Sequence, residues 1–379
     1  MSILRTFSSA ASRPFFTPPI TGVNGSNYWE KTTSFLLSTD GNYIEAYKFL
    51  WVAEDNSFFY TDSGKYTLTN GAYVSSQDLF LTTGNIRRID RIGNIAACVD
   101  VVSSSIKFLE RISGNWVLMA DLPFTYSGFS TYWGLKLSES GNVAVHFFNP
   151  NNEKLRIYRV VSGYWQLIVD TIFSEVGFSC DSGNISGDGN TFAAYFTGVG
   201  LHYLVKVYKW NGTISDQTIT NNWTKTGEIS TAPRQVAAVY LNEDGTVLLV
   251  VTYEAVSGGS GITNYSFFYN AYKFDGTTWQ QMGSTVNGVG IVSGSNPPSP
   301  EGQILNKEGN IFFVRTDASI NARTVRAYKW NGTNWAQMGP TITSNNASFV
   351  LFLSQSGSKI TMGRDPGNQL PIEQYQYIP

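Results

Sequence analysis

The stretch Ala327-Tyr-Lys-Trp-Asn-Gly-Thr-Asn-Trp-Ala-Gln-Met-Gly339 decides the fold, because close copies of it recur along the chain. It returns as Ala271-Tyr-Lys-Phe-Asp-Gly-Thr-Thr-Trp-Gln-Gln-Met-Gly283, and as Val207-Tyr-Lys-Trp-Asn-Gly with an insertion before Asn222-Trp-Thr-Lys-Thr-Gly227. Weaker copies surround Trp116 and Trp165. Asn-Gly and Asp-Gly supply the positive φ angles that two-residue hairpin turns require. Each copy therefore predicts a strand, a tight turn and a second strand that begins with an aromatic residue.

A second hairpin precedes each copy. Its pattern is that of Leu135-Lys-Leu-Ser-Glu-Ser-Gly-Asn-Val-Ala-Val145, in which apolar residues alternate on both sides of a glycine turn. Equivalent turn glycines follow one another at intervals of 48 to 64 residues: Gly41, Gly93, Gly141, Gly189, Gly245, Gly309 and Gly357. Two hairpins per interval make four strands. Seven such units predict an all-β fold, a seven-bladed β-propeller of four-stranded blades.

The two ends of the chain predict how this ring closes. The last unit, 348–379, holds only three strands, whereas Asn24-Gly-Ser-Asn-Tyr-Trp29 repeats the turn and the start of a fourth. We therefore expect Tyr28 to Ser34 to complete the last blade, which removes an exposed sheet edge. The expected domains are an N-terminal anchoring arm, 1–26, and the propeller, 27–379. The outermost strands are expected to begin at these repeat aromatics, which pack between blades: Trp29, Tyr66, Trp116, Trp165, Trp223, Trp279 and Trp335.

Composition narrows the classes of function. Charged residues make up 14% of the chain against a typical quarter, and the formal net charge is −2. With no basic stripe we expect no nucleic-acid partner, and with no long apolar run we expect no membrane insertion. The N-terminus also lacks the apolar stretch of a secretory signal. The two cysteines, Cys98 and Cys180, fall two blades apart, so we expect free thiols rather than a disulfide.

The residues predict no catalytic, cofactor or metal site. His146 and His202 lie in different blades without further ligands at suitable spacing, and a histidine-based triad needs one of them. Ser186-Gly-Asp-Gly-Asn-Thr-Phe192 resembles the aspartate box of sialidase propellers but is one residue short. A glycosidase also needs carboxylates that face the centre of the ring, and the expected inner strands are poor in them. We therefore expect a protein that is not an enzyme and takes no cofactor.

The expected connectivity gives the two faces of the ring different characters. The turns inside each hairpin lie on one face and are short, whereas the loops on the other face differ in every blade, as recognition loops do. Candidate recognition residues on that face are the aromatics Trp51, Phe129, Tyr132 and Tyr265. Both chain ends meet on the short-turn face, where the arm leaves. Its candidate anchoring residues are Ile3, Leu4, Phe7, Phe15 and Phe16. Local loop packing and an unbound tail are the competing interpretations.

The repeat Leu-Ser-x-Asp/Ser-Gly, followed by Tyr-Lys-Trp-Asn-Gly-x-x-Trp-x-Gln-x-Gly, resembles propeller repeats in large proteins of marine microbes and their viruses. The likeness runs from Asn24 to Pro379 and lacks the Gly-His and Trp-Asp dipeptides of tryptophan–aspartate repeats. The start Met-Ser-Ile-Leu-Arg-Thr-Phe is similar to virion structural proteins of marine bacteriophages.

This resemblance implies a non-enzymatic virion protein, such as a capsid decoration, fibre or tail-associated module. Its arm would bind other virion structural proteins, and its loops a host surface glycan or protein. Two alternatives stay open. One is an extracellular or cell-surface carbohydrate-binding lectin, although the unequal loops disfavour several identical binding sites. The other, less favoured, is a glycan-cleaving enzyme.

Overall fold

The computed structural model describes β-strands and tight turns over residues 27–35, 49–52, 58–61, 64–69, 72–76, 86–92, 94–100, 103–113, 115–124, 135–148, 154–172, 178–198, 204–212, 222–256, 262–293, 304–316, 323–344, 350–363 and 372–379. The strands in these ranges form antiparallel sheets. The expected all-β class is therefore confirmed. The arm, 1–26, lies outside the described residues.

The described strands group into seven sheets. The first four contain β2 (Phe49–Val52), β3 (Phe58–Thr61), β4 (Gly64–Thr69) and β5 (Ala72–Ser76); β6 (Ile86–Ile92), β7 (Ile95–Asp100), β8 (Ser105–Ile112) and β9 (Asn115–Pro123); β10 (Leu135–Leu137), β11 (Val143–Phe148), β12 (Lys154–Val161) and β13 (Tyr164–Ile172); β14 (Phe178–Ile185), β15 (Thr191–Gly198), β16 (Leu204–Trp210) and β17 (Trp223–Ser230).

The other three contain β18 (Gln235–Leu241), β19 (Val247–Val256), β20 (Ile262–Phe274), β21 (Trp279–Gln281) and β22 (Val286–Ser293); β23 (Ile311–Arg315), β24 (Arg323–Trp330), β25 (Trp335–Gln337) and β26 (Ile342–Ser344); and β27 (Val350–Leu353), β28 (Lys359–Gly363), β29 (Ile372–Ile378) and β1 (Tyr28–Phe35). In two of them the outermost strand is in two pieces, because β21 and β22 both pair with β20, and β25 and β26 both pair with β24.

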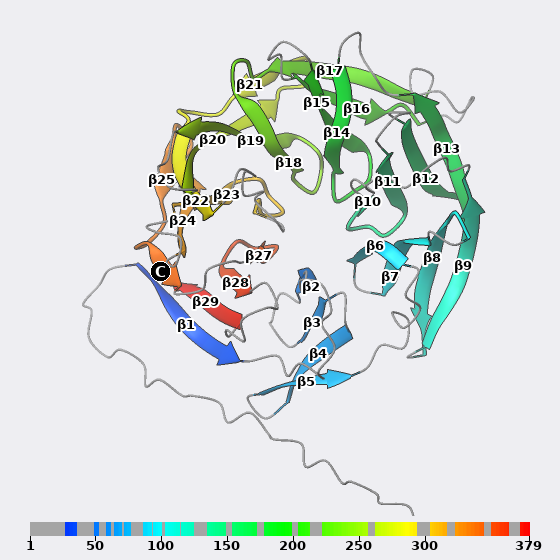
Figure 1. Ribbon diagram of the computed structural model, residues 1–379, viewed down its shortest axis with the longest axis horizontal. Coiled ribbons are helices and arrows are strands. Elements are labelled where there is room, and N and C mark those ends of the chain that lie inside the picture. Colours follow the sequence, from blue (N-terminus) through cyan, green and yellow to red (C-terminus); the bar gives the residue numbers. More distant parts are fainter. Residues whose placement is uncertain are drawn as a thin grey trace, which may run out of the picture.

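Figure 1 shows these sheets side by side around a central axis, in the order in which the chain makes them. Within most sheets the strands run outward from the axis in chain order, as in β6-β7-β8-β9. The sheet β27-β28-β29-β1 differs, because its outermost strand comes from the other end of the chain. Tyr28 lies opposite Ile378, and Phe35 opposite Ile372.

One expected repeat position is wrong. Tyr66 was placed by sequence at the start of an outermost strand, but it lies in β4, which pairs on one side with β3 and on the other with β5. The residues between β4 and β5 are Asn70 and Gly71, a strong hairpin signal in their own right. This extra hairpin makes β5 the outermost strand of its sheet.

The other six outermost strands share an irregularity three residues after the repeat Trp. In four of them one extra residue interrupts the pairing with the neighbouring strand: Thr32, Met119, Ile168 and Thr226. In the remaining two, the strand is divided at the equivalent residues, Met282 and Met338. A β-bulge of this kind bends a strand and increases its twist. The sequence Trp-x-x-Met-Gly therefore encodes a strand that bends at a fixed distance from its Trp.

The bend of one sheet receives the Trp of the next. Trp335 Nε1 donates a hydrogen bond to the Met282 carbonyl oxygen at 2.8 Å, and Trp29 Nε1 donates to the Met338 carbonyl oxygen at the same distance. Trp279 Nε1 makes the corresponding contact with Thr226 Oγ1 at 3.4 Å. The Trp thus joins neighbouring sheets, and the carbonyl that the bend exposes is satisfied.

Glycine follows the bend because the incoming ring leaves no room for a side chain. A Cβ at Gly227 would overlap Trp279, and one at Gly339 would meet Trp29 Cδ1 at 3.0 Å. Gly339 also has a φ of +73°, which disfavours other residues. The Met-Gly ending of the repeat is therefore a consequence of how closely adjacent sheets pack.

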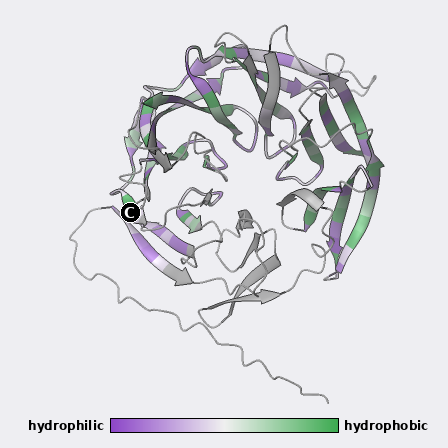
Figure 2. Cartoon of the chain, in the orientation of Figure 1, coloured by the Kyte–Doolittle hydropathy of each residue, from purple (hydrophilic) through white to green (hydrophobic). Residues whose placement is uncertain are grey.

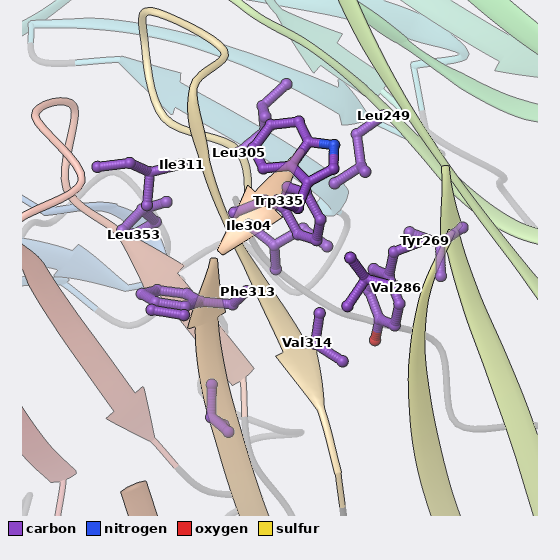
Figure 3. Close-up of a cluster of buried hydrophobic side chains, with 14 of the residues drawn as sticks. Leu249, Tyr269, Val286, Ile304, Leu305, Ile311, Phe313, Val314, Trp335 and Leu353 are labelled. Atoms are coloured by element: carbon purple, nitrogen blue, oxygen red, sulfur yellow. The ribbon is translucent and has the colours of Figure 1, made fainter. Parts of the chain in front are cut away.

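Buried side chains fill the space between sheets. Figure 3 shows Trp335 among Leu249, Leu305 and other side chains that come from neighbouring sheets. Trp335 is 7% exposed, and its ring contacts Phe312 edge-on at a centroid distance of 4.5 Å. The hydrophobic core thus lies between sheets, and each repeat Trp closes its outer end.

We predict that Trp335→Ala lowers the free energy of unfolding by about 3–5 kcal/mol, which is the usual cost of truncating a large buried aromatic side chain. Trp335→Phe keeps a ring but leaves the Met282 carbonyl without its donor, at a cost of about 1 kcal/mol. Chemical denaturation followed by Trp fluorescence and circular dichroism measures both. Gln337→Ala, at an exposed position on the same strand, is the matched control. Equal stability of Trp335→Ala and Gln337→Ala would contradict this role.

Candidate functional site: a charged cluster on the axis of the ring

Five described turns at the inner ends of the sheets share one local structure. A side-chain oxygen at the first turn position accepts a hydrogen bond from the backbone N–H five residues later, at 2.8–3.1 Å. The acceptors are Ser138, Ser186, Asn242, Asn306 and Ser354. Such side chains stabilise tight turns by replacing backbone partners. The hydrogen bond thereby fixes the backbone position of the residue that follows the acceptor in each turn.

Hydrogen bonds between turns bring those next residues together. Glu243 N–H donates to the Lys307 carbonyl oxygen, and Lys307 N–H donates to the Gln355 carbonyl oxygen, both at 3.0 Å. Ser140 N–H donates in the same way to Gly187 O at 2.8 Å. Each of these bonds joins one sheet to its neighbour. Together they form a band of turns at the inner ends of the sheets, which Figure 1 shows nearest the axis.

One contact spans the ring. Gln355 Nε2 donates a hydrogen bond to Glu139 Oε2 at 3.1 Å. Gln355 follows β27, whereas Glu139 follows β10; around the ring the sheets of β2 and β6 lie between them on one side, and those of β14, β18 and β23 on the other. The bond therefore reaches across the axis rather than along the ring. We call Glu139, Glu243, Lys307 and Gln355 the axial cluster.

The axial cluster contains a pair of carboxyl groups. Burial, a hydrogen bond to Glu243 and repulsion by its charge raise the pKa of Glu139 to about 7, while Lys307 acts in the opposite direction. Lys307 Nζ lies 3.6 Å from Glu243 Oε1. Glu243 Oε2 is buried. Glu139 therefore holds its proton to a higher pH than an exposed carboxyl group does.

Gly187 makes room for this pair, because a side chain there would overlap Glu243 Oε2. Sequence reasoning missed the cluster because each member occupies the variable position of the motif Leu-Ser-x-Asp/Ser-Gly. The equivalent positions of the first two units are Thr39, outside the described residues, and Arg91, whose side chain is not described. A usable signal was the concentration of charged and amide residues at that one position.

The surroundings of the two carboxyl groups limit the reactions that the axial cluster can catalyse. A retaining glycosidase holds its two carboxyl groups about 5–5.5 Å apart, and an inverting one further, so that a glycosidic bond fits between them. In the axial cluster, Glu139 accepts a hydrogen bond from Gln355 and Glu243 pairs with Lys307, so both carboxyl groups already have partners. Within the described ranges, no group of three or more His, Cys, Asp or Glu side chains is arranged to hold a metal ion.

The structure places one candidate recognition side chain. Tyr265 is 3% exposed and packs edge-on against Tyr253 at 5.7 Å, so it belongs to the core between sheets. Trp51 lies in the innermost strand β2, opposite Tyr60, and its side chain is not described. Phe129 and Tyr132 fall outside the described residues, as do all the candidate anchoring residues of the arm.

Two groups with reactive potential are buried. Cys98 in β7 is fully buried as a free thiol, and burial raises its pKa to about 12. His146 in β11 is also fully buried, and burial together with the charge of Arg156 lowers its pKa to about 3. Cys98 stays protonated and His146 stays neutral at physiological pH. Neither suits nucleophilic or acid–base catalysis.

The comparisons with known proteins concern the fold alone. No protein-family model matches the chain, and no curated protein matches its sequence. The solved structure of Hsv2 from Kluyveromyces marxianus is 11% identical, with a TM-score of 0.50 over 84% of this chain and 89% of that one. Hsv2 from Kluyveromyces lactis is 10% identical, with a TM-score of 0.49 over 88% and 98% of the two chains.

A Bacteroides fragilis protein described as a candidate 6-phosphogluconolactonase is 12% identical, with a TM-score of 0.47 over 88% and 98%. At such identities a likeness says nothing about activity. Together with the ring of antiparallel sheets, the Kluyveromyces marxianus match shows a β-propeller fold. In the described part of the chain no helix is long and apolar enough to cross a membrane.

We predict that the stability contributed by the axial cluster depends on pH. Because the folded-state pKa of Glu139 lies above its ordinary value of 4.5, this contribution is full below about pH 4.5 and is lost as the pH rises through about 7. Urea denaturation at about pH 5 and pH 8 measures the difference. Glu139→Gln, which cannot ionise, should flatten this part of the profile. An unchanged profile would contradict the raised pKa of Glu139.

Proposed function

We propose that this chain is a closed seven-bladed β-propeller that serves as a non-enzymatic structural or display protein of a virion. In this proposal its N-terminal arm joins other virion proteins, and the loops on the opposite face recognise a host surface glycan or protein. The observation that carries the proposal is the position of β1. It supports closure of the ring by the N-terminal strand and departure of the arm from the short-turn face.

Closure is supported by contacts that β1 shares with the other outermost strands. Its pairing with β29 extends from Tyr28 to Phe35 and is interrupted at Thr32, three residues after Trp29. Trp29 binds the Met338 carbonyl as Trp335 binds that of Met282. The N-terminal strand therefore makes the contacts of a fourth strand in the last sheet. A ring that is closed in this way by the two ends of its own chain has no exposed sheet edge between its first and last sheets.

The direction of β1 supports the polarity. β29 runs toward Ile378 in the same sense as β24 runs toward Trp330, where the turn to β25 begins. Tyr28, opposite Ile378, is therefore on the face of the short turns. In this proposal the arm departs from that face, opposite the recognition loops. An anchored display protein needs this separation between its anchor and its recognition surface.

The loop face offers one described projection. β19 and β20 extend beyond the end of β18, whose Gln235 lies opposite Tyr253. Beyond this point Glu254, Ala255 and Val256 are exposed. Arg234 anchors the base of the projection through Glu254 Oε1 at 2.6 Å. An exposed hairpin end whose base is anchored in this way is suited to recognition, because the scaffold determines where it points.

Non-enzymatic action is supported by the axial cluster. Glu139 accepts a hydrogen bond from Gln355 and Glu243 pairs with Lys307, so both carboxyl groups are engaged by other side chains. The cross-axis bond between Gln355 and Glu139 also ties distant sheets together. These contacts contribute to a stiff ring. Stiffness serves a protein that has to hold recognition loops in fixed positions.

Removal of residues 1–26 should leave the melting temperature almost unchanged, whereas removal of 1–34 should lower it strongly. The second deletion removes most of β1, exposes the edge of β29 and deletes Trp29, which is 8% exposed. Differential scanning calorimetry of the two truncated chains against the full chain measures this. Identical melting of the two would contradict closure by β1.

The virion role predicts that the full chain is found in virus particles from the culture that carries its gene, and that the chain lacking 1–26 is not incorporated. Mass spectrometry of purified particles tests the first point, and incubation of both chains with particles stripped of the protein tests the second. Binding of the isolated chain to a glycan array, together with absence from particles, would favour the lectin instead.

A further inference from the structure

The contacts that β1 shares with other outermost strands do not identify its sheet. Its Trp and its bend recur in other sheets, so neither distinguishes one sheet from another. Other outermost strands follow their neighbours through a hairpin turn such as Asn331-Gly332, which keeps the pairing local. β1 has no such tether, because Lys31 and its partner Glu373 in β29 are 342 positions apart in the sequence. Figure 2 shows hydrophilic residues along β1 and β29 where the two strands lie side by side.

Glu373 presents a buried carboxylate at the edge where β1 pairs. Its side chain is 10% exposed, and its Oε2 accepts a hydrogen bond from Tyr375 Oη at 3.0 Å. Burial, the charge of Glu373 and this hydrogen bond raise the pKa of Tyr375, so its hydroxyl group remains a donor near neutral pH. The other oxygen, Oε1, binds Lys31 Nζ. Because a buried carboxylate without a cation is costly, the edge of β29 favours a strand that supplies a positive charge at this point.

The equivalent position has the opposite character in five other sheets. By register, the residue that corresponds to Glu373 in the third strand from the axis is a cation or an amide: Lys107, Arg156, Lys206, Asn270 and Arg326. Each meets a carboxylate or hydroxyl group that follows the bend of the outermost strand, at 2.6–3.9 Å: Asp121, Asp170, Glu228, Thr285 and Thr341. The sheet β27-β28-β29-β1 reverses this arrangement, because its acid is on the third strand and its cation on the outermost one.

We propose that the pair Lys31–Glu373 determines which sheet accepts β1. On β29 the lysine neutralises a buried carboxylate, whereas on β8, β12 or β16 it would approach a cation of the third strand. β1 also carries Ser34 at the register where β9, β13 and β17 carry an acid, so it would leave that cation without its partner. Attraction to the correct sheet and repulsion from the others together produce specificity.

The edge of β29 is therefore a strand-binding site with a defined ligand. It takes a β-strand that carries a cation two residues after its Trp and no acid opposite Glu373. β17 does not meet this description, because Glu228 would lie opposite Glu373. This inference rests on the proposed closure of the ring by β1, and it adds the feature that makes the closure selective.

Exchange of the two charges tests the pair in the full chain. Lys31→Glu and Glu373→Lys should each lower the melting temperature by about 5 °C, because each places like charges together at a buried position. The double variant Lys31→Glu/Glu373→Lys should recover most of this loss. Lys225→Glu, at the same distance from the Trp of β17 and 50% exposed, is the matched control and should change the melting temperature little.

Disulfide formation measures the pairing of the two strands directly. Tyr28 and Ile378 lie opposite each other, and opposite residues of antiparallel strands have Cα atoms about 4.5–5.5 Å apart, which a disulfide can span. The full chain with Tyr28→Cys and Ile378→Cys should therefore cross-link within one molecule under mild oxidation. Addition of Lys31→Glu should reduce the cross-linked fraction, and further addition of Glu373→Lys should restore it. The chain without the two new cysteines is the background control.

The outcomes separate the ion pair from the closure. Absence of the cross-link when positions 28 and 378 alone are changed would contradict closure by β1. A cross-link that forms equally well with Lys31→Glu would leave the closure intact and overturn the role of the pair. So would a double variant that is no more stable than the two single variants.

Discussion

The hydrogen bond from a repeat Trp to the bend of the preceding sheet is the contact on which the rest of the ring depends. It joins Trp335 to Met282 and Trp29 to Met338. The bend exposes a carbonyl, the indole N–H satisfies it, and the glycine that follows allows the ring to approach. Trp, bend and glycine occur together in the outermost strands of three sheets, where Gly227, Gly283 and Gly339 follow the bend.

The fold was readable from sequence where local and tertiary requirements coincide. Asn331-Gly332 specifies a hairpin by its backbone angles, and the Trp335 that follows is required by the next sheet. The sheet β2-β3-β4-β5 was harder to predict from sequence, because its hairpin signal is not followed by a Trp that the next sheet requires. Tyr66 resembles a repeat aromatic, yet β4 continues without a bend into its pairing with β5. Aromatic character without the spacing to a bend and a glycine was not sufficient to identify an outermost strand.

The axial cluster was not readable for a different reason. Glu139 and Gln355 are 216 residues apart and stand in turns that any polar residue satisfies. Their interaction follows only from the summed rotation of the sheets between them, which no local pattern encodes. The carboxyl pair of Glu139 and Glu243 likewise depends on Gly187 in a third turn. Charged residues at equivalent positions of a circular repeat should therefore be considered together, as members of one site on the axis.

The inner and outer ends of the sheets solve opposite problems. At the inner ends, turns from successive sheets bond to one another, and polar side chains find partners because the ring brings them close. At the rim the sheets diverge, so each outermost strand must protect its own edge. Polar and charged residues do this on β1 and β17, whereas Val117, Leu118 and Met119 leave β9 apolar. The bulge three residues after the repeat Trp is a second protective device, because it bends the edge away from an incoming strand, and β1, β9, β13 and β17 share it.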